Sequence, residues 1–159
     1  MKIEVGDAIP DVTVWVMRDG APAAISSHEV LGTGKVVLFA VPGAYTPGCS
    51  LQHLPGYASR ADELAGKGVD QIVCISTNDV FVMDAWGQAH GLAESMIMMA
   101  DAHGEFADAM GTKVEVPGLG QRTTRYALVA QDGIVTGLLP EADGFSVTDS
   151  TAECVLALL

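Results

Sequence analysis

Basic residues and long apolar runs are both scarce in this sequence, and each shortage excludes a class of function. Eight Lys and Arg stand against 20 Asp and Glu, which gives a formal net charge of −12. Because an acidic surface repels a phosphate backbone, this balance argues against a nucleic-acid partner. No apolar run reaches the ~18 residues of a membrane span, so we also expect no membrane partner. Residues 1–7 carry Lys2, Glu4 and Asp7 in place of an apolar signal segment, which predicts a cytoplasmic protein.

Cysteine is scarce as well, and its spacing excludes two structural uses. The three cysteines, Cys49, Cys74 and Cys154, form neither a CxxC pair nor a zinc-binding pattern. A disulfide framework would need more of them. The four histidines show no HxH or HExxH spacing. We therefore expect no metal and no cofactor, and any cysteine chemistry should come from individual thiols.

Apolar residues are abundant instead, at 49% of the chain against 18% charged residues. This composition excludes a disordered chain and a coiled coil. The chain shows no internal repeat, low-complexity stretch or linker. We therefore predict a single domain over residues 1–159.

The predicted strands come from hydrophobic patterning. The runs at 35–41 (KVVLFAV) and 69–76 (VDQIVCIS) are apolar and rich in β-branched residues, as in buried strands. The Gln131-Asp132-Gly133 turn predicts a hairpin between 125–130 and 134–139. A weakly alternating segment at 12–17 predicts an edge strand, and 95–100 is a short apolar segment of undecided type.

The predicted helices come from capping residues. In the first, Thr46 is the candidate N-cap, Pro47 occupies the first helical position, and Gly66 and Gly68 end the helix. The other helices are expected from Asn78 or Asp79 to His90, over 104–110, and from Thr148 to the end of the chain.

The resulting order, β-α-β-α-β-β-α, describes a layered α/β domain. It is the order of a thioredoxin-like fold: a three-layer α/β/α sandwich whose mixed central sheet has a parallel and an antiparallel half. Periodicity alone leaves other α/β sandwiches open.

Cys49 stands out by its position. It follows the strand at 35–41 through a turn rich in Pro and Gly, and it falls in the first turn of a predicted helix. At that place the helix dipole and unpaired backbone N–H groups stabilise a thiolate. A buried structural cysteine is the alternative, because free cysteines are common in protein cores. Placement alone leaves both interpretations open.

The residues around Cys49 carry a resemblance to a known family. Pro42, Thr46 and Cys49 form the pattern P-x-x-x-T-x-x-C, which resembles the active-site motif of the peroxiredoxins. The stretch PGAYTPGCSLQHLPGY at 42–57 is similar to the type II, or peroxiredoxin-five-like, subfamily. The resemblance continues through the segments 74–91, 101–111 and 125–135. It thus covers nearly the whole chain, and it implies a bacterial member linked to glutathione and glutaredoxin.

The resemblance also implies a role for each matching residue. Cys49 would attack hydrogen peroxide or an organic hydroperoxide and become a sulfenic acid. The Thr46 hydroxyl would bind the peroxide, and Pro42 would shield the pocket. Arg125 would hold the thiolate and stabilise charge on the peroxide oxygens. Backbone N–H groups of Gly48 and Cys49 would add donors. Without the resemblance, Arg125 would be interpreted as a solvated arginine at a strand start.

His53 lies four residues after Cys49 and therefore on the same helical face. A Cys/His pair is typical of a hydrolase that uses nucleophilic catalysis, but the sequence shows no evident third group to direct an oxyanion, and the motif implies peroxide chemistry instead. We therefore interpret His53 as a helix-packing residue near the site.

For the reduction of the sulfenic acid, the sequence has to be searched for a second, resolving cysteine. Some relatives carry a resolving cysteine before the last helix, and Asp149 stands at that position here. Cys154 lies inside the predicted last helix, and Cys74 lies in a predicted buried strand. The interpretation that follows is one-cysteine recycling, in which glutathione caps Cys49 and glutaredoxin or a second glutathione removes it. Thioredoxin is the alternative reductant.

Two other functions and one assembly state complete the predictions. The same cysteine could serve a redox-sensing or holdase protein, or the fold could be a binding module with an inert Cys49. The resemblance further implies a homodimer that meets through the aromatic segments around Tyr45 and 80–86.

Overall fold

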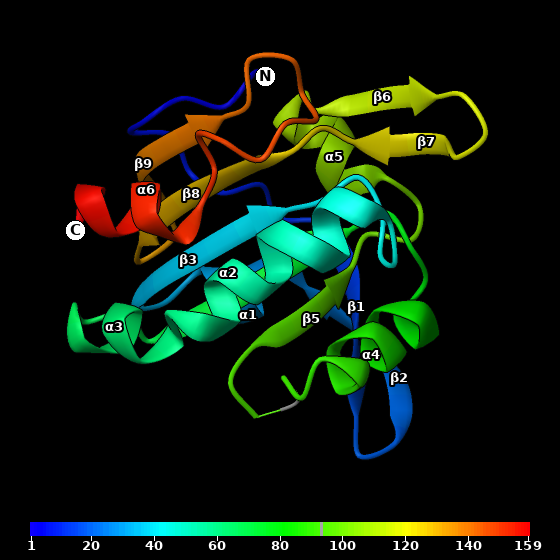
Figure 1. The fold of residues 1–159 in the computed structure, drawn as a ribbon, viewed down its shortest axis with the longest axis horizontal. Coiled ribbons are helices and arrows are strands. Elements are labelled where there is room, and N and C mark those ends of the chain that lie inside the picture. The colour runs from blue at the N-terminus through cyan, green and yellow to red at the C-terminus, as the bar shows by residue number, and fades with distance from the viewer. Residues whose placement is uncertain (93) are drawn as a thin grey trace.

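The centre of the computed structural model, which describes residues 1–92 and 94–159, is a mixed β-sheet. Its strands are β1 (Thr13–Arg18), β2 (Ala21–Ser26), β3 (Lys35–Ala40), β4 (Gln71–Ser76), β5 (Ile97–Ala100), β8 (Tyr126–Gln131) and β9 (Ile134–Pro140). Among the described residues the sheet has seven strands in the order β2-β1-β5-β4-β3-β8-β9 (Figure 1). Strands β3, β4 and β5 run parallel, and the other neighbours pair antiparallel. The predicted parallel and antiparallel halves are therefore confirmed.

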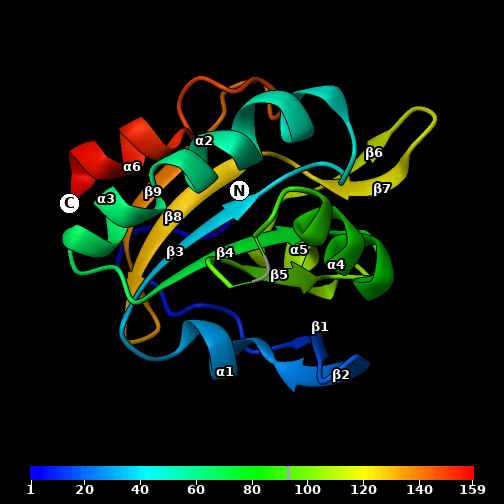
Figure 2. The same cartoon turned by 60° about the horizontal axis from the view of Figure 1, so that its bottom comes forward.

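Helices cover both faces of this sheet (Figure 2). They are α1 (Ser27–Leu31), the π-helix η1 (Cys49–His53), α2 (Leu54–Ser59), α3 (Ala61–Gly66), α4 (Val80–Ala89), α5 (Glu105–Met110) and α6 (Ala152–Leu158). One apolar core lies between the sheet and α2, α3, α4 and α6, and a second lies between the opposite face and α1 and α5. This arrangement confirms the predicted three-layer thioredoxin-like sandwich.

Strand β3 shows why its sequence is continuously apolar. Val37 and Phe39 face the first core, whereas Val36, Leu38 and Ala40 face the second. All five are completely buried. A strand in the middle of a sheet with helices on both faces has no polar side, so alternation disappears.

Two parts of the sheet region differ from the prediction. The strand at Thr13–Arg18 is not an edge strand, because it pairs with both β2 and β5. The edge is β2, whose sequence APAAIS is mostly exposed and carries no apolar alternation. The segment at 113–123 forms a separate hairpin of β6 (Lys113–Val116) and β7 (Gly120–Thr123), which projects beyond the main sheet in both views (Figures 1 and 2).

The predicted helix boundaries also need two corrections. The helix after Thr46 is not continuous, because it opens with the π-turn of η1 and is broken at Arg60 between α2 and α3. The last helix begins at Ala152 and not near Thr148, and Thr151 is its N-cap. In contrast, Asp79 caps α4 as expected, with its side chain accepting a hydrogen bond from the Val82 N–H at 2.9 Å.

Glu141 explains why the last helix starts late. The Glu141 side chain is only 5% exposed and faces the loop that precedes α6. Its carboxylate accepts hydrogen bonds from the backbone N–H groups of Thr148, Asp149 and Ser150 and from two of their hydroxyls, all at 2.8–2.9 Å. Because these N–H groups donate to one carboxylate, residues 148–150 form a loop and the helix begins only after them. We call residues 148–150 the clamped loop.

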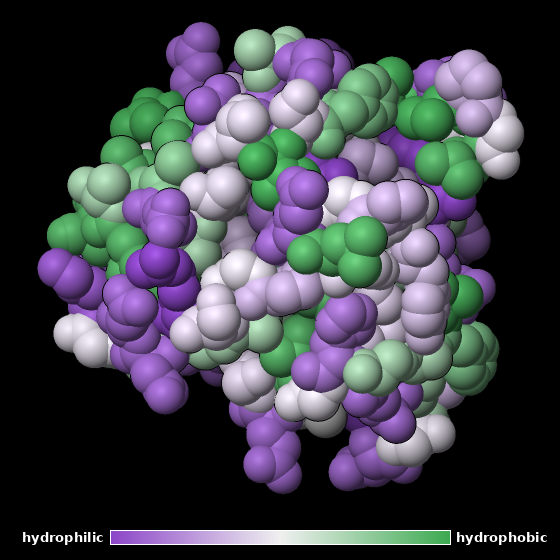
Figure 3. All heavy atoms as spheres, in the orientation of Figure 1, coloured by the Kyte–Doolittle hydropathy of each residue, from purple (hydrophilic) through white to green (hydrophobic). Residues whose placement is uncertain are grey.

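The molecular surface mixes polar and apolar residues. Hydrophobic residues gather at the edge that holds the C-terminal end of α6, where Leu158 is 51% exposed (Figure 3). Within 1–92 and 94–159, no helix has the length and apolar character needed to cross a membrane.

The clamped loop generates a prediction about stability and pH. Burial by itself raises the pKa of Glu141, but the hydrogen bonds from Ser150 and Thr148 lower that pKa from 4.5 to about 2. A carboxylate whose pKa is lower in the folded state stabilises the fold above its unfolded pKa, and this contribution is lost as the pH falls. We expect Glu141→Gln to lower the free energy of unfolding at pH 7 by about 2 kcal/mol or more.

The measurement is denaturant unfolding of wild type and variant between pH 7 and pH 2. The difference between them should be largest above pH 4.5 and should shrink towards pH 2. Glu153→Gln is the matched control, because Glu153 makes only an exposed ion pair with Arg60 and should contribute less than about 1 kcal/mol. Equal losses in the two variants, or a loss that does not change with pH, would contradict the proposed clamp.

Candidate active site

Cys49 opens the π-helix η1, directly after the turn that follows β3. The residue is completely buried. Its carbonyl accepts from the Leu54 N–H, five residues later, which is the hydrogen bond that defines a π-turn. Such turns are rare and occur frequently at functional sites. The sulfur is thus held in a widened helical turn that is packed against the sheet.

The turn before Cys49 is held by its own hydrogen bonds. The Thr46 N–H and hydroxyl both donate to the Gly43 carbonyl, at 3.3 and 2.6 Å. Thr46 immediately precedes the helical residues, yet its hydroxyl is a donor here and does not act as the predicted helix cap. The hydroxyl oxygen keeps lone pairs that can accept a hydrogen bond from a peroxide. Pro42 is buried at the start of the turn, as its predicted shielding role requires.

Arg125 is brought to the Cys49 sulfur from a distant part of the sequence. It lies directly before β8 and is 4% exposed. Its backbone N–H donates to the Gly144 carbonyl at 2.7 Å. Its guanidinium Nη2 donates to the Cys49 Sγ at 3.2 Å. This contact places a buried positive charge directly against the sulfur. The solvated-arginine interpretation is therefore wrong for this residue.

Gly48 allows the two groups to approach. A Cβ added at this position would lie 3.2 Å from the Arg125 Nη2 and 3.7 Å from Val147 Cγ2. The first contact is tighter than an ordinary van der Waals distance, so a side chain here would press on the guanidinium. The requirement is for space, because Gly48 has the ordinary helical φ of −62°.

His53 has a larger part in the site than the sequence indicated. Its ring does pack, with centroids 5.0 Å from Phe39 and 5.5 Å from Tyr57. It also lies within hydrogen-bond distance of Arg125, with 2.9 Å between His53 Nδ1 and Arg125 Nη1. Burial and the nearby Arg125 charge lower the pKa of His53 from 6.5 to about 4, against a hydrogen bond to Ser150 that raises it. The ring is therefore neutral at neutral pH.

The sequence did not reveal this role, because the partners of His53 are remote. Arg125 is 72 residues away and Ser150 is 97 residues away. The available signal was the four-residue spacing from Cys49, which placed His53 near the sulfur without showing what it would contact. Among the described contacts, the two ring nitrogens of His53 face Arg125 and Ser150 and not the Cys49 sulfur, so the histidine is not placed to take a proton from that thiol as a Cys/His hydrolase requires.

The other two cysteines lie in different surroundings. All three are free thiols. Cys74 is completely buried in β4, and burial together with the Cys49 charge raises the pKa of its thiol well above the ordinary value. Cys154 is partly exposed in the first turn of α6, where its sulfur contacts the Thr151 hydroxyl at 3.2 Å. Asp149, at the position of the resolving cysteine in some relatives, is exposed.

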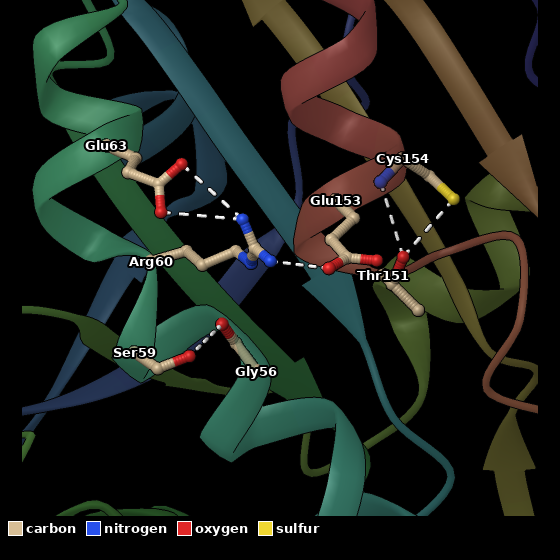
Figure 4. Close-up of polar contacts among 7 residues, drawn as sticks. All are labelled: Gly56, Ser59, Arg60, Glu63, Thr151, Glu153 and Cys154. Carbon is tan, nitrogen blue, oxygen red and sulfur yellow. Dashed lines mark hydrogen bonds and ion pairs between the residues drawn. The ribbon is translucent and has the colours of Figure 1, made fainter.

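A cavity of about 360 Å³ lies beside the site, between α2 and the start of α6. Arg60 stands between Glu63 and Glu153 at this place, and the Cys154 sulfur points away from it (Figure 4). The lining residues are Gln52, His53, Gly56, Ser59, Arg60, Val147, Thr151, Ala152 and Glu153. Val147 also faces Gly48, so the cavity adjoins the wall of the Cys49 site. In the part of the chain that the structure describes, no three His, Cys, Asp or Glu side chains form a group that could hold a metal ion.

Comparisons with known proteins agree with this geometry. Residues 4–156 match the model of the Redoxin family. The chain is 41% identical over 160 residues to Peroxiredoxin-2B of Arabidopsis thaliana, which covers 99% of this chain and 98% of that protein.

Solved structures give the same result. Reduced Prx3 of Vibrio vulnificus in complex with hydrogen peroxide superposes with a TM-score of 0.93 and 42% identity, over 99% of each chain. Peroxiredoxin 5 of Alvinella pompejana superposes with a TM-score of 0.86 and 35% identity, over 98% of this chain and 97% of that one. The chain therefore belongs to the peroxiredoxin family, and it is a peroxidase with a thioredoxin-like fold.

Proposed function

We propose that Cys49 is the peroxidatic residue and that it reduces hydrogen peroxide and organic hydroperoxides. The thiolate sulfur attacks one peroxide oxygen, so an S–O bond forms as the O–O bond breaks. Cys49 is oxidised to the sulfenic acid, and the departing oxygen takes a proton and leaves as water or an alcohol. Prx3 of Vibrio vulnificus, which was crystallised with hydrogen peroxide, supports this substrate for a chain 42% identical to it.

The observation that carries the proposal is the 3.2 Å contact between Arg125 Nη2 and Cys49 Sγ. The same guanidinium can stabilise the thiolate before attack and the negative charge that develops on the peroxide oxygens. Thr46 would orient the peroxide through its hydroxyl, Pro42 would exclude water, and the N–H groups of Gly48 and Cys49 would add donors.

We further propose that glutathione, with glutaredoxin or a second glutathione, regenerates the thiol. The first thiol condenses with the sulfenic acid, which releases water and leaves a mixed disulfide; the second thiol then releases Cys49 as the oxidised pair departs. Three observations support one-cysteine recycling: Asp149 replaces a resolving cysteine, Cys74 is completely buried, and the Cys154 sulfur contacts the loop before α6. Thioredoxin is the alternative reductant.

A homodimer is proposed from the aromatic residues near the site. Tyr45 is 56% exposed and Phe81 is 62% exposed, and both belong to the segments in which the resemblance places the subunit contact. The Tyr45 ring lies 6.4 Å from the buried ring of Trp86, so the active-site turn packs against α4. Tyr45 also adopts a φ of +65°, in the left-handed region that residues other than glycine seldom occupy.

Three further points stay predictions of the sequence. They are membership of the type II subfamily in a bacterium, the single domain over residues 1–159, and the cytoplasmic location. The likeness to peroxiredoxin 5 of Alvinella pompejana supports the subfamily, but it carries no support for a bacterial source.

Single-turnover oxidation by hydrogen peroxide tests the site. We expect Cys49→Ser to abolish the reaction and Arg125→Ala to slow it about a hundred- to a thousandfold, because a positioned charged donor is lost. Arg125→Lys keeps the charge but cannot reproduce the planar fork, so it should fall between wild type and Arg125→Ala. A wild-type rate no better than that of a free thiol would favour an inert binding module. Fast oxidation without repeated turnover under any thiol reductant would favour a redox sensor.

Intact mass after one equivalent of peroxide tests the recycling route. We expect the reduced protein to gain one oxygen, or the dimedone adduct when dimedone is present, and Cys49→Ser to gain neither. Glutathione should then add one glutathionyl group, which glutaredoxin removes. Loss of two hydrogens in wild type that disappears in Cys154→Ser, with Cys74→Ser as control, would show an internal disulfide and overturn this route.

Phe81→Glu tests the dimer. We expect wild type to elute as a dimer in size-exclusion chromatography with light scattering. Phe81→Glu should elute as a monomer because it places a charge in the apolar contact. Val5→Glu is the control, since Val5 is equally exposed, at 61%, but lies outside the segments around Tyr45 and 80–86. A monomeric wild type, or two variants that behave alike, would argue against this interface.

A further inference from the structure

The ring of His53 lies between the active-site arginine and the clamped loop. On one side, Nδ1 is 2.9 Å from Arg125 Nη1; on the other, Nε2 is 2.9 Å from the Ser150 carbonyl oxygen. A guanidinium has no acceptor, so Nδ1 has to supply the lone pair for the first contact. The hydrogen of the neutral ring is then on Nε2, which donates to the Ser150 carbonyl. The two neighbours together determine a single tautomer.

The Ser150 carbonyl is itself held in place from both sides. It accepts a second hydrogen bond from the Tyr57 hydroxyl at 2.7 Å. The N–H and hydroxyl of Ser150 donate to Glu141 Oε1 at 2.9 and 2.8 Å. All four residues of this connection, His53, Tyr57, Glu141 and Ser150, are buried. The acceptor for the His53 N–H is therefore fixed by a carboxylate that does not touch the arginine.

Each of the three guanidinium nitrogens of Arg125 donates one of the described hydrogen bonds. Nε donates to the Phe145 carbonyl at 2.9 Å, Nη1 donates to His53, and Nη2 donates to the Cys49 sulfur. Because the group is planar, two fixed contacts determine where the third points. Without an acceptor at His53, Nη1 would be a buried donor with no partner, and the guanidinium could turn away from the sulfur.

We propose that His53 is a positioning residue that aims Arg125 at Cys49 by offering Nδ1 as a neutral acceptor. This inference deepens the proposed function and rests on it. Neutrality is the important property of the acceptor. A carboxylate in this place would pair with Arg125 and offset the positive charge that Cys49 and the peroxide need. An imidazole fixes the direction of the guanidinium and leaves its charge available to the sulfur.

Two amide substitutions separate the two nitrogens of the ring. In His53→Asn the side-chain oxygen, one bond beyond Cγ, can take the place of Nδ1 and accept from Arg125. In His53→Gln the amide lies one bond farther and takes the place of Nε2, where it can donate to Ser150 but cannot accept from Arg125. His53→Phe keeps the ring that packs on Phe39 and Tyr57 and removes both nitrogens.

The first readout is the second-order rate constant for oxidation by hydrogen peroxide at pH 7. We expect His53→Asn to stay within about tenfold of wild type, and His53→Gln and His53→Phe to be about a hundredfold slower or more. The second readout is the thiolate fraction of Cys49 from ultraviolet absorbance, which should follow the same order. Melting temperatures, measured in parallel, show whether either readout merely follows stability.

The outcomes separate this inference from the proposed function. Equal rates and thiolate fractions for His53→Asn and His53→Gln, or a ranking that follows melting temperature, would overturn the positioning role. If wild type reacts no faster than free cysteine, the proposed function fails, while the thiolate fractions still decide whether His53 directs Arg125 at the sulfur. If His53→Phe does not fold, the two amide variants alone give the answer.

Discussion

The contact between the buried guanidinium of Arg125 and the buried sulfur of Cys49 is the interaction on which the rest of the site depends. Burying a cation is costly unless it is paired and hydrogen-bonded. The Nε, Nη1 and Nη2 atoms of Arg125 donate to a carbonyl at Phe145, an imidazole at His53 and the sulfur at Cys49, respectively. These acceptors come from the loop after β9 and from η1 after β3. Strands β3 and β8 are neighbours in the sheet, and this pairing brings the two regions together.

The loop between β9 and α6 supplies negative charge without cancelling that of Arg125. Two carboxylates organise this loop through backbone N–H groups. Glu141 holds residues 148–150, and Asp143 accepts from the N–H groups of Phe145 and Ser146 at 2.8 Å. Since neither carboxylate hydrogen-bonds the Arg125 guanidinium among the described contacts, the cation keeps its charge for the sulfur. An acidic protein can thus build a cationic site by using its acids to fix the backbone.

How much of this could be predicted from the sequence differs from element to element. The strands β3 and β4 follow from their apolar β-branched runs, and the hairpin of β8 and β9 follows from Asp132-Gly133. The local motif identifies Cys49, Thr46 and Pro42. Arg125 is identified only because the sequence around it resembles that of a known family. Strand β2 is missed because it packs few side chains. The late start of α6 is missed because Glu141 competes for N–H groups that a local helix rule assigns to the helix. His53 is noticed but misjudged, since its partners are 72 and 97 residues away.

Complete burial of Cys49 has a consequence for the order of events in turnover. A peroxide or a thiol cannot touch an atom without accessible surface, so reaction at the sulfur requires the residues around it to move. Hydrogen peroxide, which is little larger than water, needs only a narrow gap. A thiol carried on a peptide or on a protein needs more room. The helical segment after Cys49 is suited to this, because it is divided into the π-turn η1, α2 and α3 and is not one continuous helix. The cavity between α2 and α6 provides space on the same side.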